Sequence, residues 1–532
     1  YGASISITAN GAEVSDLTLA AELPAPVNVV IRVDPGQEFR FGRTDIENAP
    51  PRPTDPADLD AVAPVTSAGF ERGTTARADA IGNASRLAVE RWRQLSHAKA
   101  REAGREVLAV HETGRLDVTL SLDPGPPVRY GEISTEGARR LDQDFILYMA
   151  DLAPGGEFDP DEIDLARARL TALGVFDSVR FVEADTLGPG DTLPLLVSVS
   201  ERERRTIGVG GTYSTLDGLG LSAYWVHRNM FGRAERLRFD ASIERLLTTR
   251  DWEQYNYNLG VVLTFPGIPN PDTNLVTAAL ARQADFENYR ETSFTARVGL
   301  SSRVNDRLQY DLFGLAQIAR FEDDFGTRNF KTVGLAGTLQ YDRRDDPLDA
   351  TSGYYLALEA APSYEFDFGN PAIRGTVEGR TFLGFGEEAR FVLAGRAKLG
   401  AFVGGPIEET APDQLFFAGG GGSIRGYAFR SIGVDYDDDG EIITVGGQGL
   451  LELSGEVRAR ITETIGAVGF VDAGIVSADA TFSSTEDLKI GVGVGARYYT
   501  GFGPLRFDLA FPVEPGPDDA TFAIYIGIGQ AF

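Results

Sequence analysis

Apolar and polar residues alternate along many segments of the chain after about residue 205. Residues 451–461, 490–499 and 505–511 place apolar side chains at every second position, with polar residues or glycines between them. This pattern is typical of β-strands, whose successive side chains point to opposite faces. The polar faces carry Arg and Glu, which a dry core does not accept singly but a water-filled lumen does. We therefore predict an all-β, antiparallel transmembrane barrel over residues 204–532, with about 16 strands of roughly ten residues.

The final segment, residues 520–532, continues the alternation and is predicted to be the last strand. The large apolar residues expected to face lipid are Phe522, Ile524, Ile526, Ile528 and Phe532. A terminal aromatic on an alternating strand is typical of proteins targeted to the outer membrane. Gln530 interrupts the apolar face, which is expected to weaken the closing seam of the barrel.

The first part of the chain mixes helical and extended patterns and contains an internal repeat. Residues 34–42 read DPGQEFRFG and residues 123–131 read DPGPPVRYG. Recurrence of this motif at a domain-sized offset suggests tandem copies of one module. Generic α+β folding is the alternative, and the shared motif favours the repeat.

The second copy predicts the element order β-α-α-β-β. Its segments are a strand at 128–134, a helical stretch at 138–152, a second helix, and strands at 178–184 and 193–201. Asp159 can cap the second helix and Pro160 suits its first turn, while Gly174 ends it.

The first copy is predicted to hold a strand near 39–47, a helix near 76–98, and strands at 105–113 and 115–123. Residues 2–9 and 26–34 resemble the last two strands of a further copy. The domain organisation that we expect is therefore a partial module at 1–36, modules at 37–125 and 126–203, and the barrel at 204–532.

Composition and charge exclude several classes of function. The formal charge of −28 and the absence of a Lys/Arg cluster argue against a nucleic-acid partner. The chain has no cysteine and only three histidines, without ligand spacing, so we expect no thiolate or histidine metal site. No stretch approaches about 18 consecutive apolar residues, which excludes a transmembrane helix.

Five motifs, in order along the chain, carry a resemblance to a known family. They are HRNMFGRAERL at 227–237, YDRRDDPLDATSGYY at 341–355, SIRGY at 423–427, FVDAG at 470–474 and GFGPLRFDLAFP at 501–512. With the repeated modules and the barrel, they resemble the BamA/TamA superfamily of outer-membrane assembly factors. The modules look like polypeptide-transport-associated (POTRA) domains. The resemblance implies a barrel in the outer membrane of a Gram-negative bacterium, with POTRA modules in the periplasm.

The motif at 423–427 predicts how one loop is held. Strand parity makes residues 403–447 the sixth extracellular loop, and its glycines allow the chain to fold back into the lumen. Parity also turns Asp472 inward with Phe470 and Gly474, and Glu456 inward on the neighbouring strand. The resemblance implies that the loop arginine docks on the aspartate of the thirteenth strand. The predicted loop latch is Arg425, Gly426, Tyr427, Asp472, Glu456, Phe470 and Gly474.

Other candidate chemistry is weak. Residues 435–440 copy the first half of an EF-hand loop, but Gly446 takes the place of the twelfth-position glutamate and no flanking helices are predicted. The glycines of GVGVGA at 491–496 are expected to make room for the folded loop. No serine–histidine pairing or Gly-x-Ser-x-Gly motif is present, so we predict no enzyme activity and no cofactor.

The leading hypothesis is a factor that inserts or exports β-rich, autotransporter-like clients through a weak seam between the first and last strands. The residues expected to weaken the seam are Gly527, Gly529, Gln530 and Phe532. A further interpretation is that these glycines only relieve crowding. Three modules rather than five are similar to the TamA branch, which implies a TamB-like partner in addition to outer-membrane lipids and client polypeptides. The alternatives are a two-partner secretion pore, a passive porin and a lipid-transfer conduit.

Overall fold

The computed structural model describes residues 4–9, 12–13, 29–34, 37–51, 62–215, 218–248, 251–286, 288–438, 441–483, 487–501, 503–516 and 520–532. These residues form two compact units. The first holds most of the N-terminal modules, and the second holds the barrel together with residues 138–145 and 172–177. No helix within the described ranges is long and apolar enough to cross a membrane.

Three small sheets make up the N-terminal part of the chain. The first has the order β2-β1-β3, with β1 Ser4–Ala9, β2 Ala12–Glu13 and β3 Val29–Asp34. The second has the order β4-β6-β5, with β4 Arg40–Glu47, β5 Arg101–Val110 and β6 Arg115–Asp123. The third has the order β7-β9-β8, with β7 Arg129–Glu136, β8 Phe176–Glu183 and β9 Thr192–Glu201.

Helices accompany the second and third sheets. They are the 3₁₀ helix η1 Val65–Ala68, α1 Ala78–Gln94, α2 Gln143–Ala150 and α3 Pro160–Ala172. The Asp161 amide donates to Asp159 Oδ1 over 2.9 Å, which confirms the predicted cap of α3. The β-α-α-β-β order predicted for the third module is confirmed.

Two predicted boundaries are wrong. The strand expected at 105–113 spans Arg101–Val110, because residues 111–114 form a turn that ends on Gly114 at φ 60°. The helical stretch expected at 138–152 contains only Gln143–Ala150. The residues before it form bends, and the amides of residues 139–141 all donate to Glu201.

The structure explains the repeated Arg-aromatic-Gly motif. The aromatic residue is buried in each copy, as Phe41 and as Tyr130. The glycine permits a close approach to the neighbouring strand: a Cβ on Gly42 would lie 2.0 Å from Asp117 Oδ1, and one on Gly131 would lie 2.9 Å from Pro194 N. The strand pairing shifts register just after the aromatic in both copies. The repeat therefore encodes one bulged, buried strand.

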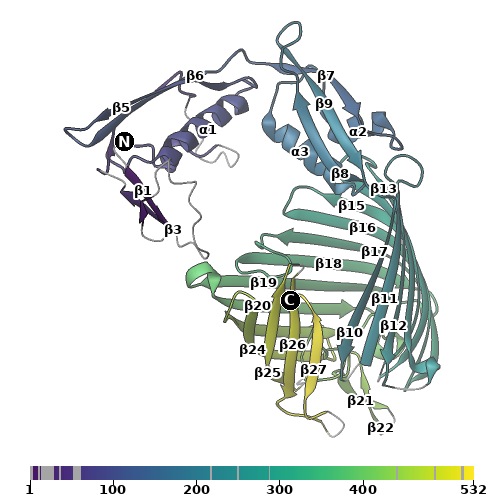
Figure 1. Cartoon of the computed structure of the whole chain (residues 1–532). Helices are drawn as coiled ribbons and strands as arrows, with labels where there is room; N and C mark the ends of the chain where they lie inside the picture. The colour runs from purple at the N-terminus through teal and green to yellow at the C-terminus, as the bar shows by residue number, and fades with distance from the viewer. Residues whose placement is uncertain are drawn as a thin grey trace. The chain divides into compact units, whose positions relative to one another are not determined.

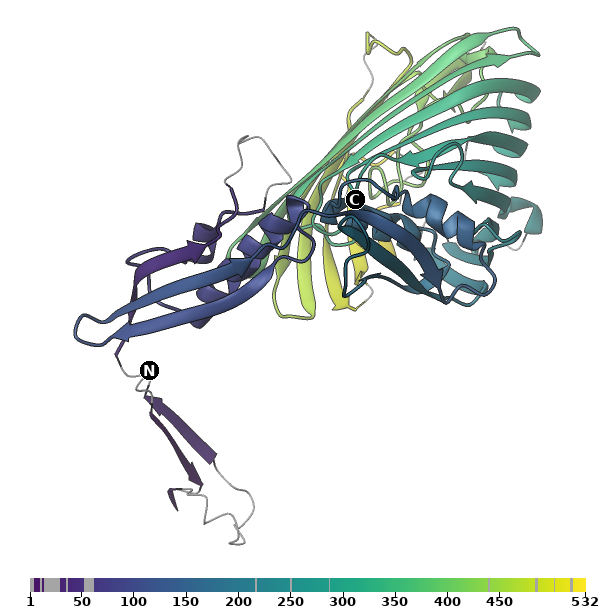
Figure 2. The same ribbon diagram turned by 90° about the horizontal axis from the view of Figure 1, so that it is seen from above.

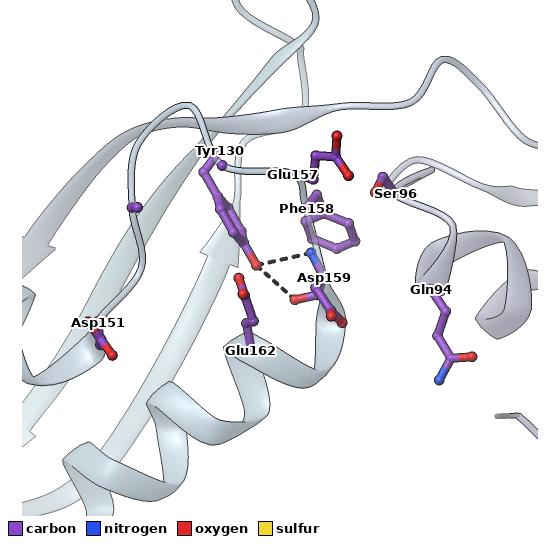
Figure 3. Close-up of a pocket in the computed structure, with 10 residues that line it drawn as sticks. Gln94, Ser96, Tyr130, Asp151, Glu157, Phe158, Asp159 and Glu162 are labelled. Carbon is purple, nitrogen blue, oxygen red and sulfur yellow. Dashed lines mark hydrogen bonds between the residues drawn. The ribbon is translucent and has the colours of Figure 1, made fainter. Parts of the chain in front are cut away.

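Tyr130 also connects its strand to α3 (Figure 3). Its hydroxyl donates to the Asp159 carbonyl over 2.8 Å and accepts from the Asp159 amide over 3.1 Å. Burial raises the pKa of this phenol above its ordinary range. A cavity of about 390 Å³ lies beside Tyr130 and is lined by polar residues, among them Glu157 and Glu162.

The barrel is closed, antiparallel and 16-stranded, as predicted (Figure 1, Figure 2). Each strand pairs with the next along the chain, except that β20 pairs with β23. Apolar residues such as Val209, Leu259 and Val494 are exposed on its outer face. The first eight strands are β10 Arg205–Ser214, β11 Gly218–Arg228, β12 Arg236–Leu246, β13 Asn256–Pro266, β14 Thr273–Asp285, β15 Arg290–Arg303, β16 Leu308–Asp323 and β17 Gly326–Asp342. The last eight are β18 Gly353–Glu365, β19 Pro371–Phe385, β20 Phe391–Val403, β23 Gly449–Arg460, β24 Ile465–Ser477, β25 Lys489–Thr500, β26 Gly503–Pro512 and β27 Ala523–Ile528.

The last strand is shorter than predicted. β27 ends at Ile528 rather than continuing to residue 532, because Gly529 adopts φ 88°. The following residues turn into the lumen, where Gln530 accepts from Arg497 Nε over 2.8 Å. Phe532 packs near Phe382 instead of facing lipid. The faces predicted for Gln530 and Phe532 are therefore wrong.

Glu201 offers a test of the short α2. Burial alone would raise the pKa of its carboxyl, but hydrogen bonds from Arg140, Arg139 and Leu141 outweigh burial and lower the pKa to about 2. We expect E201Q to speed hydrogen exchange of the amides of residues 139–141 about tenfold at pH 7, because a charged acceptor is lost.

The same carboxylate predicts a pH dependence. Its pKa is lower in the folded chain than the unfolded value of about 4.3. Its stabilisation is therefore complete above that value and is lost as the pH falls toward about 2. Unfolding curves between pH 7 and pH 3 should show a smaller loss of stability for E201Q than for the wild type. Equal losses would contradict this assignment.

Candidate functional site

The connection between β20 and β23 folds into the barrel. It contains a hairpin of β21 Val434–Asp438 and β22 Glu441–Val445, and its residues Ile424, Arg425 and Tyr427 are at most 2% exposed. Connection residues such as Phe416 and Ile432 share a hydrophobic cluster with strand residues of the barrel wall: Phe402, Leu450 and Val476. The lumen on this side therefore has a packed interior.

Arg425 is bound by three carboxylates from three strands. Its Nε and Nη2 donate to the two oxygens of Asp472 over 2.7 and 3.0 Å, which is a bidentate pair. Its Nη1 donates to Glu456 over 2.8 Å and to Asp508 over 3.3 Å. The Arg425 Cζ lies 3.5 Å from the centroid of the Phe470 ring, which adds a cation–π contact. We call Arg425, Asp472, Glu456 and Asp508 the Arg425 cluster.

Two further arginines balance the charge of this cluster. Arg458 donates to Glu456 over 2.9 Å, and Arg497 pairs with Asp508. All of these side chains are at most 4% exposed. Buried charges need partners that replace their lost hydration, and here the buried carboxylates and guanidinium groups match one another.

Glycines on the barrel wall make room for the connection. A Cβ on Gly491 would lie 1.9 Å from the Arg425 carbonyl oxygen, and one on Gly474 would lie 2.8 Å from Ile424. Gly493 and Gly495 leave space in the same way for Phe470 and Asp508. Gly426 adopts φ 106° against the backbone of Pro512. No larger residue fits these positions without a shift.

Comparison with known proteins then identifies the family. A family model described as the Omp85 superfamily domain matches residues 206–532. The chain belongs to the Omp85 superfamily. The barrel therefore lies in the outer membrane of a Gram-negative bacterium, and the N-terminal modules are periplasmic POTRA modules.

Curated relatives are longer than this Omp85 chain. The outer membrane protein assembly factor BamA of Neisseria meningitidis is 22% identical over 481 residues, which cover 79% of this chain and 59% of that protein. BamA of Nitratidesulfovibrio vulgaris is 24% identical over 76% of this chain and 51% of its own length. The chain thus spans between half and three fifths of these relatives.

Solved structures show the same fold. BamA from Haemophilus ducreyi lacking POTRA domains 1-3 aligns with a TM-score of 0.70 at 16% identity, covering 92% of this chain and 99% of that one. CdiB from Acinetobacter baumannii aligns with a TM-score of 0.55 at 12% identity, covering 93% and 91%.

The structure brings the predicted latch residues of this Omp85 barrel together. Arg425 lies against Asp472, Glu456 and Phe470, as the preceding distances show. Tyr427 donates to the Glu514 carbonyl over 3.3 Å. The Gly426 amide donates to the hydroxyl of Tyr525 over 3.2 Å, and this hydroxyl donates to the Tyr427 carbonyl over 3.3 Å.

Sequence reasoning missed four residues of this site: Asp508, Arg458, Arg497 and Tyr525. Alternation placed the first three on polar faces of their strands, so parity was a usable signal. The contact of Tyr525 with the connection joins residues 98 positions apart. No local pattern reports such a contact.

A second arginine of the connection contacts the turn between β14 and β15. Arg430 has its Cζ 4.8 to 5.5 Å from the ring centroids of Phe417, Tyr289 and Phe286. The Asn288 side chain donates to the Arg430 carbonyl over 2.9 Å. Residues 286–289 join β14 to β15, so the connection is anchored on two separate parts of the wall.

The predicted seam residues occupy different environments. Gly527 lies in β27, and a Cβ on it would lie 3.5 Å from Arg506 Nη2. Gly529, Gln530 and Phe532 follow the strand. Gln530 contacts the Arg425 cluster indirectly through Arg497, which pairs with Asp508. The seam residues and the latch residues are thus linked through the lumen.

The acidic run at 435–440 lies partly outside the described residues, since 439 and 440 are not described. Its described residues, 435–438, belong to β21, which pairs with β22 as a hairpin.

Removal of one partner from the Arg425 cluster should destabilise the barrel. We expect R425A or D472N to lower the free energy of unfolding by about 3–5 kcal/mol, because a buried charge is left without its partner. Thermal or denaturant unfolding in detergent measures this change. R307A removes an exposed arginine from a turn and is the matched control. Equal stability of R425A and R307A would contradict the role of the cluster.

A methyl group on the barrel wall should displace the connection. In G491A the new Cβ meets the Arg425 carbonyl, whereas in G469A no atom lies within 4 Å of it. We expect trypsin to cleave after Arg425 and Arg430 faster in G491A than in the wild type, since the connection must leave its seat. G469A should resemble the wild type, and identical cleavage of both variants would show that the wall tolerates the methyl group.

Proposed function

We propose that this barrel inserts or exports β-rich client proteins at the outer membrane through the seam between β10 and β27. The observation that carries the proposal is the short pairing of these two strands. β27 pairs with β10 only at Tyr213 with Ile526 and Ser214 with Tyr525, whereas β10 pairs with β11 along all of Arg205–Ser214 (Figure 1). One further backbone bond, from Thr215 to Ile524, extends the seam over 3.3 Å.

The rest of β10 presents an open strand edge. Within the described residues, the backbone of 205–212 has no strand partner on the side of β27. Ile207 and Val209 on this segment are 74% and 83% exposed. We call the unpaired side of residues 205–212 the β10 edge. Unpaired amides and carbonyls at such an edge are a template for another strand.

This edge addresses the physical problem of inserting a barrel. A nascent strand cannot enter lipid with unpaired backbone groups, because each costs several kcal/mol there. A strand that pairs with the β10 edge satisfies these groups before it reaches lipid. Strand addition also accepts many client sequences, since main-chain bonds supply the affinity.

The geometry at Gly529 favours the interpretation that this glycine weakens the seam over the interpretation that it only relieves crowding. No atom lies within 4 Å of the position where its Cβ would be, yet its φ is 88°. Its role is therefore conformational, because it ends β27 and turns the following residues away from β10. The interpretation that glycine only relieves crowding does not account for this position.

The folded connection is coupled to the seam. Tyr525 supplies one of the two paired residues of β27 and also holds Gly426 and Tyr427 through its hydroxyl. A cavity of about 650 Å³ lies behind the seam and is lined by residues of β10, β27 and the connection, including Phe429. Movement of the connection would therefore change the seam directly.

The proposed function includes a class of client and a partner protein. Autotransporter-like clients would suit an edge that accepts β-strands, and a TamB-like partner would work with the periplasmic modules. The runner-up function is a two-partner secretion pore, which the fold similarity to CdiB supports. A passive porin fits less well, because the folded connection occupies the lumen beside the Arg425 cluster.

A reversible lock on the seam tests the proposal. Thr212 and Gly527 are the next positions in the register set by Tyr213 and Ile526. Because the chain has no cysteine, T212C/G527C introduces a single disulfide. We expect oxidation to stop insertion of a barrel client into proteoliposomes, and reduction to restore it.

A matched lock separates the seam from general stiffening. Ser242 and Asn258 pair directly on β12 and β13, so S242C/N258C places a disulfide within a complete strand pair. This variant should insert clients normally when oxidised. If the locked seam inserts clients as fast as this control, the seam is not the route.

A further inference from the structure

The outward face of β16 and β17 follows from the packing of their inward residues. Phe321 of β16 and Phe330 of β17 pack in one cluster with Ala411 of the folded connection, so these two side chains point into the lumen. Successive residues of a strand point to opposite faces. Arg320 and Lys331 therefore point away from the lumen, toward the lipid that surrounds the barrel.

Both cations lie one membrane thickness from a tyrosine on the same face. Arg320 follows Tyr310 by ten positions on β16, and Lys331 precedes Tyr341 by ten positions on β17. A tilted strand crosses the hydrocarbon core of a membrane in about 9–11 residues. The outward positions between each tyrosine and its cation hold only apolar residues or glycine: Leu312, Gly314, Ala316 and Ile318 on β16, and Val333, Leu335, Gly337 and Leu339 on β17. The tyrosines and the cations therefore mark the two boundaries of the lipid core.

The cations mark the outer of these boundaries. β10 begins directly after the periplasmic modules, and neighbouring strands of the barrel run in opposite directions. The seventh strand of the barrel, β16, therefore runs toward the cell exterior, where β17 begins. Arg320 and Lys331 lie near this extracellular end, at the depth of the outer-leaflet headgroups.

Arg320 and Lys331 have ion-pair partners that leave most of their donors open. Nη2 of Arg320 donates to Glu322 over 3.0 Å, and Nζ of Lys331 donates to Asp367 over 2.8 Å. Arg290 of β15 contacts the same Glu322 over 3.8 Å. The side chains of Arg320 and Lys331 are 57% and 64% exposed, and exposed pairs of this kind are weak. A guanidinium group has five N–H donors and an ammonium group has three, so both side chains can bind a further acceptor.

The neighbouring part of the extracellular rim has a different character. On β18, β19 and β20, the outward residues at this end include Tyr364, Ile373 and Val403, and all three are exposed. The whole chain carries a formal charge of −28, which repels anionic lipids. A phosphate at this surface therefore needs a local group of cations.

We propose that Arg320 and Lys331 bind the phosphate of a lipid headgroup in the outer leaflet of the outer membrane. Arg320 pairs with Asn329, so Lys331 is its diagonal neighbour on the next strand, at a distance of about 7–8 Å. Two long side chains at this spacing reach one phosphate group together. Guanidinium and ammonium groups both bind phosphate through charged hydrogen bonds. The site includes no residue of β10 or β27, so it is independent of the seam.

The acidic neighbours give the proposal a second, opposite expectation. Glu322 and Asp367 compete with a lipid phosphate for the same two cations. E322Q/D367N should therefore bind a phosphorylated lipid more tightly than the wild type, whereas R320Q/K331Q should bind it more weakly. Misfolding does not explain a gain in binding.

The test measures lipid binding to the full chain in detergent by native mass spectrometry. The probe is diphosphoryl lipid A, and monogalactosyldiacylglycerol serves as a sugar lipid without phosphate. EDTA is present to remove divalent cations. We expect the wild type to bind lipid A about tenfold more tightly than either the wild type binds the galactolipid or R320Q/K331Q binds lipid A, since charged hydrogen bonds to phosphate are lost in both cases.

Two further variants assign the binding to these positions. R303Q/R307Q removes two exposed arginines from the periplasmic end of the adjoining strands and should bind lipid A as the wild type does. R320K/K331R keeps both charges and should retain the binding.

Several results would overturn the proposal. One is equal binding of lipid A by the wild type and R320Q/K331Q, and another is an equal loss in R303Q/R307Q. If lipid A binds only when Mg²⁺ replaces EDTA, and E322Q/D367N abolishes that binding, the carboxylates hold the lipid through a divalent cation and the proposal is wrong.

Discussion

The burial of one guanidinium group governs the interior of this barrel. Arg425 reaches carboxylates on β23, β24 and β26, so a single side chain joins three strands that are not all neighbours. Its charge is desolvated, and only a geometry that satisfies both sides of each pair offsets that loss. The matching Arg458 and Arg497 keep the carboxylates paired as well. The connection is therefore held in one position, because moving Arg425 away from the barrel wall would leave several buried charges without partners at once.

The folded connection is attached to the barrel wall at two places, whereas the backbone pairing between β10 and β27 is short. The connection contacts β27 through Tyr525 and the β14–β15 hairpin through Arg430. The connection thus joins the last strand to the β14–β15 hairpin, whereas the backbones of β10 and β27 pair at only two residue pairs.

Much of this architecture follows from local patterns in the sequence. Period-two alternation predicts the strands and their inward faces. The sequence therefore places Asp472 and Phe470 on the inner face of one strand and Glu456 on the inner face of its neighbour. The cap at Asp159 similarly gives the start of α3. The patterns fail where distant residues make the contacts: the amides of residues 139–141 donate to Glu201, and Gln530 accepts from Arg497 in the lumen. Length and parity also say nothing of how few residues pair at the seam.

Glycine shows why the sequence alone leaves the seam open to interpretation. At Gly491 the constraint is space, because the Arg425 carbonyl occupies the position of a side chain. At Gly426 both space and a positive φ are required. At Gly529 the surroundings are empty and only φ matters. The three residues look alike in sequence, yet the first two tighten the packing of the connection and the third ends a strand. One residue type therefore serves opposite purposes in this barrel, because it permits close packing at Gly491 and Gly426 and ends a strand at Gly529.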